Sequence, residues 1–148
     1  MAFHFSLDVV LRLRRGLEHR QELLFQAAQH QAAALGRQID ELDLRLAEAA
    51  ARRTRQMESG MTAAELHFEA LCRRVVLESR ESLRQKLIQA QSLRDSLAES
   101  LRQARRQRET LETLRDDQRL LYLQQEARVA QREHDDMLLL RRAYLRRS

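Results

Sequence analysis

The sequence has no proline and no tryptophan, one cysteine and three glycines, and only 4% of its 148 residues are aromatic. Proline is the commonest cause of a kink or stop inside a helix, so its absence permits long uninterrupted helices. So few aromatic side chains suit thin helical packing better than a thick globular core. The lone Cys72 excludes an intramolecular disulfide and fits a reducing compartment.

Long apolar runs are also missing. The longest, such as residues 137–140, are far shorter than the ~20 residues that a membrane-spanning helix requires, and the N-terminal residues lack the order of a signal peptide. These absences predict a cytoplasmic protein without a membrane span. The net charge of +5 comes almost entirely from arginine and would attract an acidic protein surface, nucleic acid or anionic lipid.

Most of the chain is built from Leu, Ala, Arg, Glu and Gln, and its apolar residues recur at steps of three and four. This spacing predicts a narrow apolar stripe along each of two helices. The first stripe comprises Val10, Leu13, Leu17, Leu24, Ala28, Leu35, Ile39, Leu42, Leu46 and Ala49, and the second comprises Leu66, Ala70, Val76, Leu83, Leu87, Ala90, Leu97, Leu101, Ala104, Leu111, Leu114, Leu121 and Gln125. Between Ala28 and Leu42 the steps of three, four, four and three predict a stutter in the coiled coil.

One good turn signal separates the two stripes. Gly60 suits the left-handed turn after a helix, and Thr62 and Glu65 have the spacing of a capping box. We therefore expect helices at about 6–58 and 63–145, joined by a turn at 59–62, in a single domain over residues 1–148. Two long helices with a short connection bury both stripes only if they lie antiparallel. The predicted fold is all-α, a long two-helix antiparallel coiled-coil hairpin.

The second predicted helix is longer than the first. Residues 114–148 would therefore extend beyond the hairpin without an intramolecular partner, although they carry many apolar side chains. Such an overhang is expected either to fray or to dock on another protein.

No pattern in the sequence indicates catalysis or a cofactor. It contains no phosphate-binding glycine loop, no paired cysteines and no His-Glu-x-x-His motif. The run His134-Asp135-Asp136 cannot converge on a metal, because neighbouring helical residues point in different directions. Acidic residues interleave with the basic run 102–108 without an aromatic stacking platform. We expect no enzyme activity, no cofactor, no metal and no nucleic-acid partner.

Both ends of the chain resemble one family. The opening Phe5-Ser6-Leu7-Asp8-Val9-Val10-Leu11-Arg12-Leu13-Arg14 resembles the start of the flagellar FliJ family of type III export proteins. Residues 125–137 resemble the family's C-terminal pattern, in which basic residues precede an Asp-Glu pair. Here that pair is Asp135-Asp136, and arginines replace the family's usual lysines.

The resemblance implies a stalk similar to the central stalk of rotary ATPases. It implies binding to the hexameric flagellar export ATPase, promotion of that ATPase's assembly and activity, and contact with the cytoplasmic domain of the export gate membrane protein and with flagellar substrate chaperones. Such a protein would be cytoplasmic, peripheral at the cytoplasmic face of the inner membrane, and would support flagellum assembly, motility and chemotaxis.

The resemblance also implies two sets of site residues. For ATPase binding they are Leu7, Leu11, Arg12, Glu126, Arg132, Asp136 and Met137. The ring formed by the hexameric ATPase would also bury Phe3 and Phe5. For export-gate binding they are Gln38, Leu42, Arg45, Phe68, Leu71 and Val75. The competing interpretation is that Leu7, Leu11 and Leu42 are ordinary residues of the hairpin seam, the line of side chains along which the two helices pack against each other.

Two other functions remain open at this point. One is the related stalk protein of a virulence type III secretion system. The other is a generic coiled-coil scaffold or a basic nucleic-acid-binding hairpin.

Overall fold

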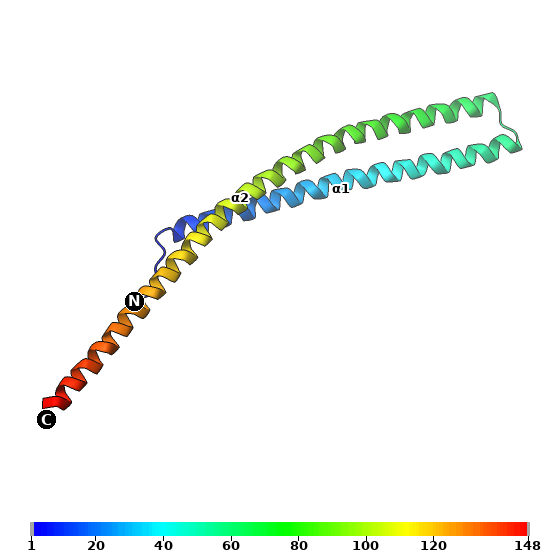
Figure 1. Ribbon diagram of the computed structural model, residues 1–148. Coiled ribbons are helices and arrows are strands. Elements are labelled where there is room, and N and C mark those ends of the chain that lie inside the picture. Colours follow the sequence, from blue (N-terminus) through cyan, green and yellow to red (C-terminus); the bar gives the residue numbers. More distant parts are fainter. Residues whose placement is uncertain (1, 148) are drawn as a thin grey trace. The chain divides into compact units, whose positions relative to one another are not determined.

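A computed structural model describes residues 2–147 and contains two helices, α1 (Asp8–Ser59) and α2 (Ala63–Arg147), joined by a short turn (Figure 1). No strand occurs within the described residues. The two helices pack against each other, so the predicted all-α helical hairpin is confirmed.

Local hydrogen bonds explain where the helices begin and end. Gly60 has a φ of 99°, a left-handed conformation that glycine adopts without a side-chain clash, and it follows the last residue of α1. At the start of α2, the Glu65 backbone N–H donates to Thr62 Oγ1 at 3.2 Å, and the Thr62 N–H donates to Glu65 Oε2 at 3.0 Å. This reciprocal pair is the predicted capping box.

The chain divides into two compact units. The terminal unit consists of residues 2–18 and 103–147 among those described, and the turn unit consists of residues 19–102. The single-domain organisation expected from the sequence stays a prediction.

In the turn unit, most of the less exposed residues of α1 recur at heptad spacing. These are Gln21, Phe25, Ala28, Ala32, Leu35, Ile39, Leu42, Leu46 and Arg53. Glu22, Ala34, Gly36 and Asp43 are half-buried beside them. Ala32 is buried and the neighbouring Gln31 is exposed, so the steps between Ala28 and Leu42 continue to alternate between four and three. The predicted stutter is wrong, because the seam position between Ala28 and Leu35 is Ala32 and not Gln31, which the predicted steps require.

The seam of the terminal unit differs from the predicted stripe. On α1 it contains Leu11, Arg14 and Glu18, and on α2 it contains Ala104, Arg108, Leu111, Arg115, Gln118 and Tyr122. Leu11 is 0% exposed, whereas the predicted seam residue Leu13 is 61% exposed. The prediction followed apolar residues and missed that Arg14, Glu18 and Arg108 occupy this part of the seam with partners on the other helix.

The N-terminal segment covers more of α2 than expected. Phe5 is buried, and the ring centroid of Phe3 lies 5.7 Å from that of Tyr122. All described residues after Tyr122 are exposed. The overhang therefore begins at Leu123 and not at Leu114, and Phe5 belongs to the hairpin core, unavailable to a surrounding ring.

Candidate partner-binding surfaces

An ion-pair network occupies one side of the terminal unit. Arg108 Nε donates to Glu18 across the seam, and Arg108 Nη1 donates to Glu112 Oε2 at 2.6 Å. Arg15 Nη2 donates to Glu112 Oε1 at 2.9 Å. The three seam-side residues, Glu18, Arg108 and Glu112, are largely covered, so their charges are compensated by one another and by Arg15. Charge-assisted hydrogen bonds of this kind stabilise a polar seam.

This network predicts an acid-sensitive hairpin. Hydrogen bonding from Arg15 lowers the pKa of Glu112 from its ordinary value of 4.5. A lowered folded-state pKa means that the ionised carboxylate stabilises the hairpin above pH 4.5, and that this contribution is lost as the pH falls through the folded-state value. We expect the melting temperature of the native protein to fall more steeply below this pH than that of Glu112→Gln.

Glu133→Gln is the matched control for that comparison, because Glu133 is exposed on the overhang. Its melting temperature should follow the native pH profile. A Glu112→Gln profile that parallels the native one would show that the network contributes no acid-sensitive stability.

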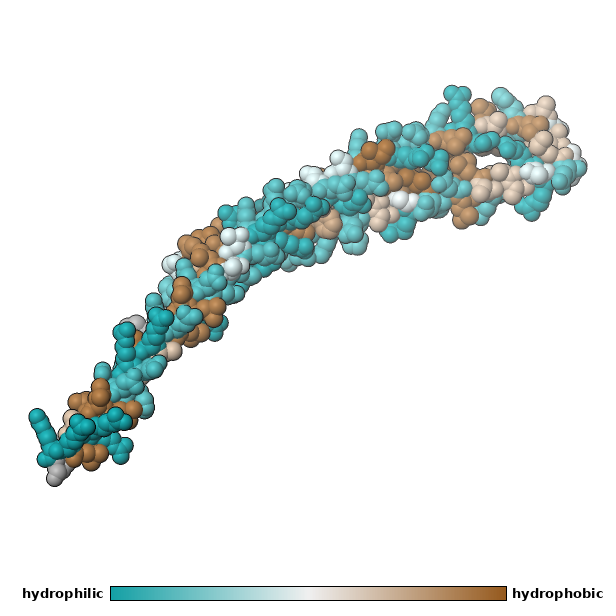
Figure 2. Space-filling model, viewed as in Figure 1, coloured by the Kyte–Doolittle hydropathy of each residue, from teal (hydrophilic) through white to brown (hydrophobic). Residues whose placement is uncertain are grey.

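The opposite side of the terminal unit carries exposed apolar side chains, with the polar Gln107, Thr110 and Asp117 among them. A residue that directly precedes a seam position lies about 100° around the helix from it. Because the helices are antiparallel, such positions on α1 and α2 flank the same side of the pair. They include Val10, Leu13, Leu17, Leu114 and Leu121, all of which are exposed. Figure 2 shows apolar atoms at the surface where the beginning of α1 runs beside α2. We call these five residues the apolar face.

All seven residues predicted to bind the ATPase lie in the terminal unit. Leu7 is 37% exposed, and Arg12 is exposed while its Nη2 pairs with Asp8 Oδ2 at 2.5 Å. Leu11 is fully buried, so it supports the seam and cannot touch a partner while the hairpin is closed. The remaining predicted residues, Glu126, Arg132, Asp136 and Met137, are exposed on the overhang of α2.

Glu126 also has a role within the helix. The Tyr122 hydroxyl donates to the Glu126 carboxylate one turn away, and this hydrogen bond raises the pKa of Tyr122. Tyr122 contacts Phe3 as well. Glu126 therefore stands at the boundary between the covered part of α2 and the overhang.

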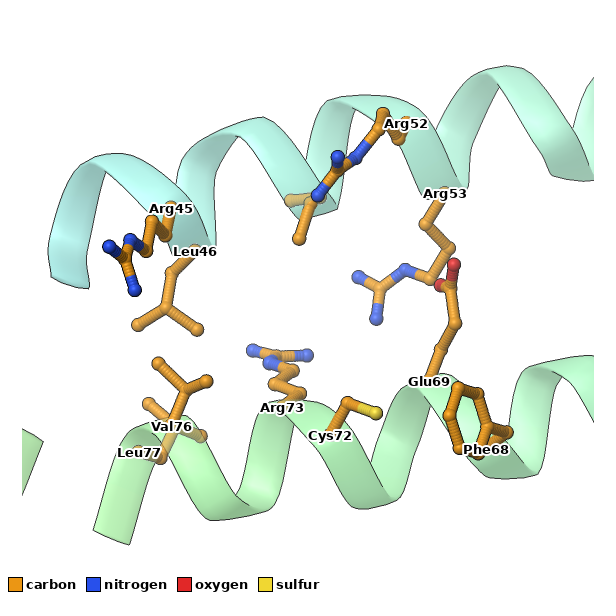
Figure 3. Close-up of a pocket in the computed structure, with 12 residues that line it drawn as sticks. Arg45, Leu46, Arg52, Arg53, Phe68, Glu69, Cys72, Arg73, Val76 and Leu77 are labelled. Carbon is orange, nitrogen blue, oxygen red and sulfur yellow. The ribbon is translucent and has the colours of Figure 1, made fainter. Parts of the chain in front are cut away.

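In the turn unit, a cleft of about 400 Å³ separates the two helices (Figure 3). Its apolar lining includes Leu46, Phe68, Cys72, Val76 and Leu77. Figure 2 shows an opening between the helices close to the turn. The cleft gives the turn unit a concave surface with an apolar lining.

Arginines dominate the charged residues of this cleft. Arg45, Arg52, Arg53 and Arg73 line it together with one acid, Glu69. In Figure 3, Arg53 and Arg73 extend into the space between the helices. Arg45 pairs with Glu41 at 2.6 Å, whereas no ion pair forms at Arg52, Arg53 or Arg73 within residues 2–147. The cleft thus presents an excess of positive charge beside apolar side chains.

The six residues predicted to bind the export gate all lie in the turn unit, but only two line the cleft. Arg45 and Phe68 are lining residues, and Phe68 is 67% exposed. Gln38, Leu71 and Val75 are exposed and Leu42 is half-buried in the seam, all outside the lining. Sequence analysis did not single out the other lining residues Cys72, Leu77, Arg52, Arg53 and Arg73. Arg53 lies seven residues after Leu46, and an arginine at that heptad position is the sequence signal that could have indicated an open seam.

Two classes of site are not found in the described chain. No helix within residues 2–147 is both long enough and apolar enough to cross a membrane. Among the same residues, no group of three or more His, Cys, Asp or Glu side chains is placed to hold a metal ion.

Comparison with known protein families identifies a match. The family described as Flagellar FliJ protein matches residues 3–148. No curated protein and no solved structure matches the chain. The family match spans nearly the whole sequence and agrees with the resemblance at both ends of the chain. This protein therefore belongs to the flagellar FliJ family, whose members are non-enzymatic components of flagellar type III protein export.

Proposed function

We propose that this chain is a coiled-coil stalk that binds the hexameric flagellar export ATPase through its terminal unit and promotes the ATPase's assembly and activity. The observation that carries this proposal is the overhang, residues 123–147, which exposes every side chain although it holds many apolar residues. Exposed apolar surface on this scale is typical of a protein-binding segment. Membership of a flagellar export family supplies the class of partner.

Exposure selects the residues that would contact the ATPase. Leu7 and Arg12 at the start of α1, together with Glu126, Arg132, Asp136 and Met137 on α2, form the docking set. Leu11 is left out of the contact because it is buried, and its part is to hold α1 against α2. The apolar face lies in the same unit and would extend the contact.

The turn unit would contact the cytoplasmic domain of the export gate membrane protein. Gln38, Leu42, Arg45, Phe68, Leu71 and Val75 form the proposed gate-binding set, and the cleft beside Arg45 and Phe68 supplies a concave surface for it. Flagellar substrate chaperones are the third class of partner. A protein with these contacts would act at the cytoplasmic face of the inner membrane and support flagellum assembly, motility and chemotaxis.

The experiment that tests the ATPase proposal measures ATP hydrolysis by the purified flagellar export ATPase, and its oligomeric state, with and without this protein. We expect faster hydrolysis and a larger fraction of hexamer. If neither quantity changes at micromolar concentrations of both proteins, the chain is a scaffold with another partner and the stalk proposal fails.

The gate contact makes a separate prediction. Phe68→Ala removes the largest apolar side chain of the cleft and should weaken binding to the purified cytoplasmic domain of the export gate about tenfold, as measured by calorimetry. Leu44→Ala is the matched control, since Leu44 is 60% exposed in the same unit and does not line the cleft. Equal losses for the two variants would count against the cleft as the binding surface.

A further inference from the structure

The last turns of α2 differ in chemistry from the rest of the overhang. Residues 137–147 contain four arginines, Arg141, Arg142, Arg146 and Arg147, and no acidic residue, although Asp135 and Asp136 immediately precede them. None of these arginines forms an ion pair within the described residues. The segment therefore carries a concentrated positive charge that no ion pair within residues 2–147 neutralises.

Apolar side chains alternate with these arginines. Met137, Leu140 and Tyr144 follow the spacing i, i+3 and i+7, so they share one helix face, and they are 70%, 70% and 75% exposed. With about 100° per residue, Arg141 and Arg147 flank this face on its two sides. Arg142 and Arg146 lie on the opposite side of the helix. Figure 2 shows the apolar and polar atoms of this end intermixed at the surface.

We infer that residues 137–147 bind the surface of an anionic lipid membrane as a short interfacial helix. A helix in that position buries its apolar face among the acyl chains, and flanking arginines extend their guanidinium groups to lipid phosphates. The negative surface potential of an anionic bilayer attracts each basic residue near it and so increases the affinity of the helix for the membrane. The helix lies on the membrane and does not cross it.

Two features favour a lipid surface over other anionic partners. Leu138 and Leu145 are exposed outside the Met137 face, and a single partner helix would leave them in water, whereas the headgroup layer covers a wider sector. Nucleic acid would neutralise the arginines but would leave Leu140 and Met137 exposed. The inference concerns the chain and lipid alone and does not depend on the proposed ATPase contact.

Co-sedimentation with vesicles tests this inference. We expect the full-length protein to bind vesicles of equal parts phosphatidylglycerol and phosphatidylcholine and not vesicles of phosphatidylcholine alone. Arg141→Gln/Arg147→Gln should lower the affinity about tenfold or more. Arg119→Gln/Arg128→Gln removes the same charge from exposed positions of α2 outside the segment and should have a much smaller effect.

The apolar face is tested in the same way. Leu140→Gln/Tyr144→Gln should also lower vesicle affinity about tenfold, while Leu120→Gln/Leu123→Gln, two exposed leucines earlier on α2, should retain it. These side chains are exposed, so circular dichroism should be unchanged in every variant. Failure of the full-length protein to bind anionic vesicles overturns the inference.

A nucleic-acid partner would give a different result. In that case a DNA oligonucleotide would bind as tightly as the vesicles, the arginine variant would lose both activities, and the Leu140→Gln/Tyr144→Gln variant would lose neither. That pattern overturns the membrane inference as well.

Discussion

Removal of residues 123–148 is expected to abolish stimulation of the flagellar export ATPase while leaving the hairpin folded. Every described side chain after Tyr122 is exposed. These residues therefore add little to the packing of α1 against α2. The Tyr122–Glu126 hydrogen bond is exposed too, and its loss should change stability by less than about 1 kcal/mol. Four residues of the docking set disappear with the truncation.

Steady-state ATP hydrolysis and a thermal melt of the truncated protein check this prediction. Phe68→Ala is the control, because it alters an exposed residue of the turn unit and should stimulate the ATPase normally. Stimulation that survives the truncation would remove the overhang from the docking surface. A melting temperature several degrees below that of the full chain would instead show that the overhang packs on the hairpin.

A second truncation separates ATPase docking from lipid binding. Truncation after Met137 keeps the whole docking set and removes the four terminal arginines. It should stimulate the ATPase and fail to bind anionic vesicles. Loss of ATPase stimulation in this shorter truncation would show that residues 138–148 belong to the docking surface. That outcome would say nothing about whether the same residues bind lipid.

The helices and the turn could be predicted because local chemistry determines them. No proline interrupts either helix, and Gly60, Thr62 and Glu65 satisfy the backbone at the turn with their own conformations and side chains. The seam of the turn unit follows the same logic around Ile39, where apolar residues occupy the buried positions. In these regions the apolar pattern and the packing coincide.

The seam of the terminal unit could not be predicted in this way. Arg14, Glu18 and Arg108 occupy seam positions because each finds a hydrogen-bonding partner on the other helix. These side chains are half-buried. A polar group that loses water is tolerated when its hydrogen bonds are satisfied, and the partners become known only when the register of the two helices is known. The apolar residues one position earlier are then left outside, where they form the apolar face.

The cleft could not be predicted from the sequence either, for a related reason. Val76 belongs to the predicted stripe and lines the cleft, but the stripe does not reveal that the two helices separate there. Small Ala49 and long Arg53 follow Leu46 on α1 and do not fill the space between the helices with apolar volume. The width of a seam depends on residue pairs across it, and pairs cannot be read from one helix at a time.

Leu11→Asp is expected to open the terminal unit, with a loss of about 3–5 kcal/mol of folding free energy. Leu11 is the one fully buried large side chain of the described chain, and aspartate would place a charge there without a partner. Leu13→Asp makes the same chemical change two residues further along α1, at a side chain that is 61% exposed. It should cost no more than about 0.5 kcal/mol.

Hydrogen exchange of the backbone amides in residues 8–18 distinguishes the two variants. Leu11→Asp should lose protection there, and Leu13→Asp should keep it. The opposite order would place Val10, Leu13 and Leu17 in the seam, as the apolar pattern alone predicts, and would turn Leu11 outward toward the ATPase. The chemical change is the same in both variants, so a difference in amide protection can come only from the positions of the two residues relative to the seam. The result therefore decides whether Leu11 supports the docking surface or belongs to it.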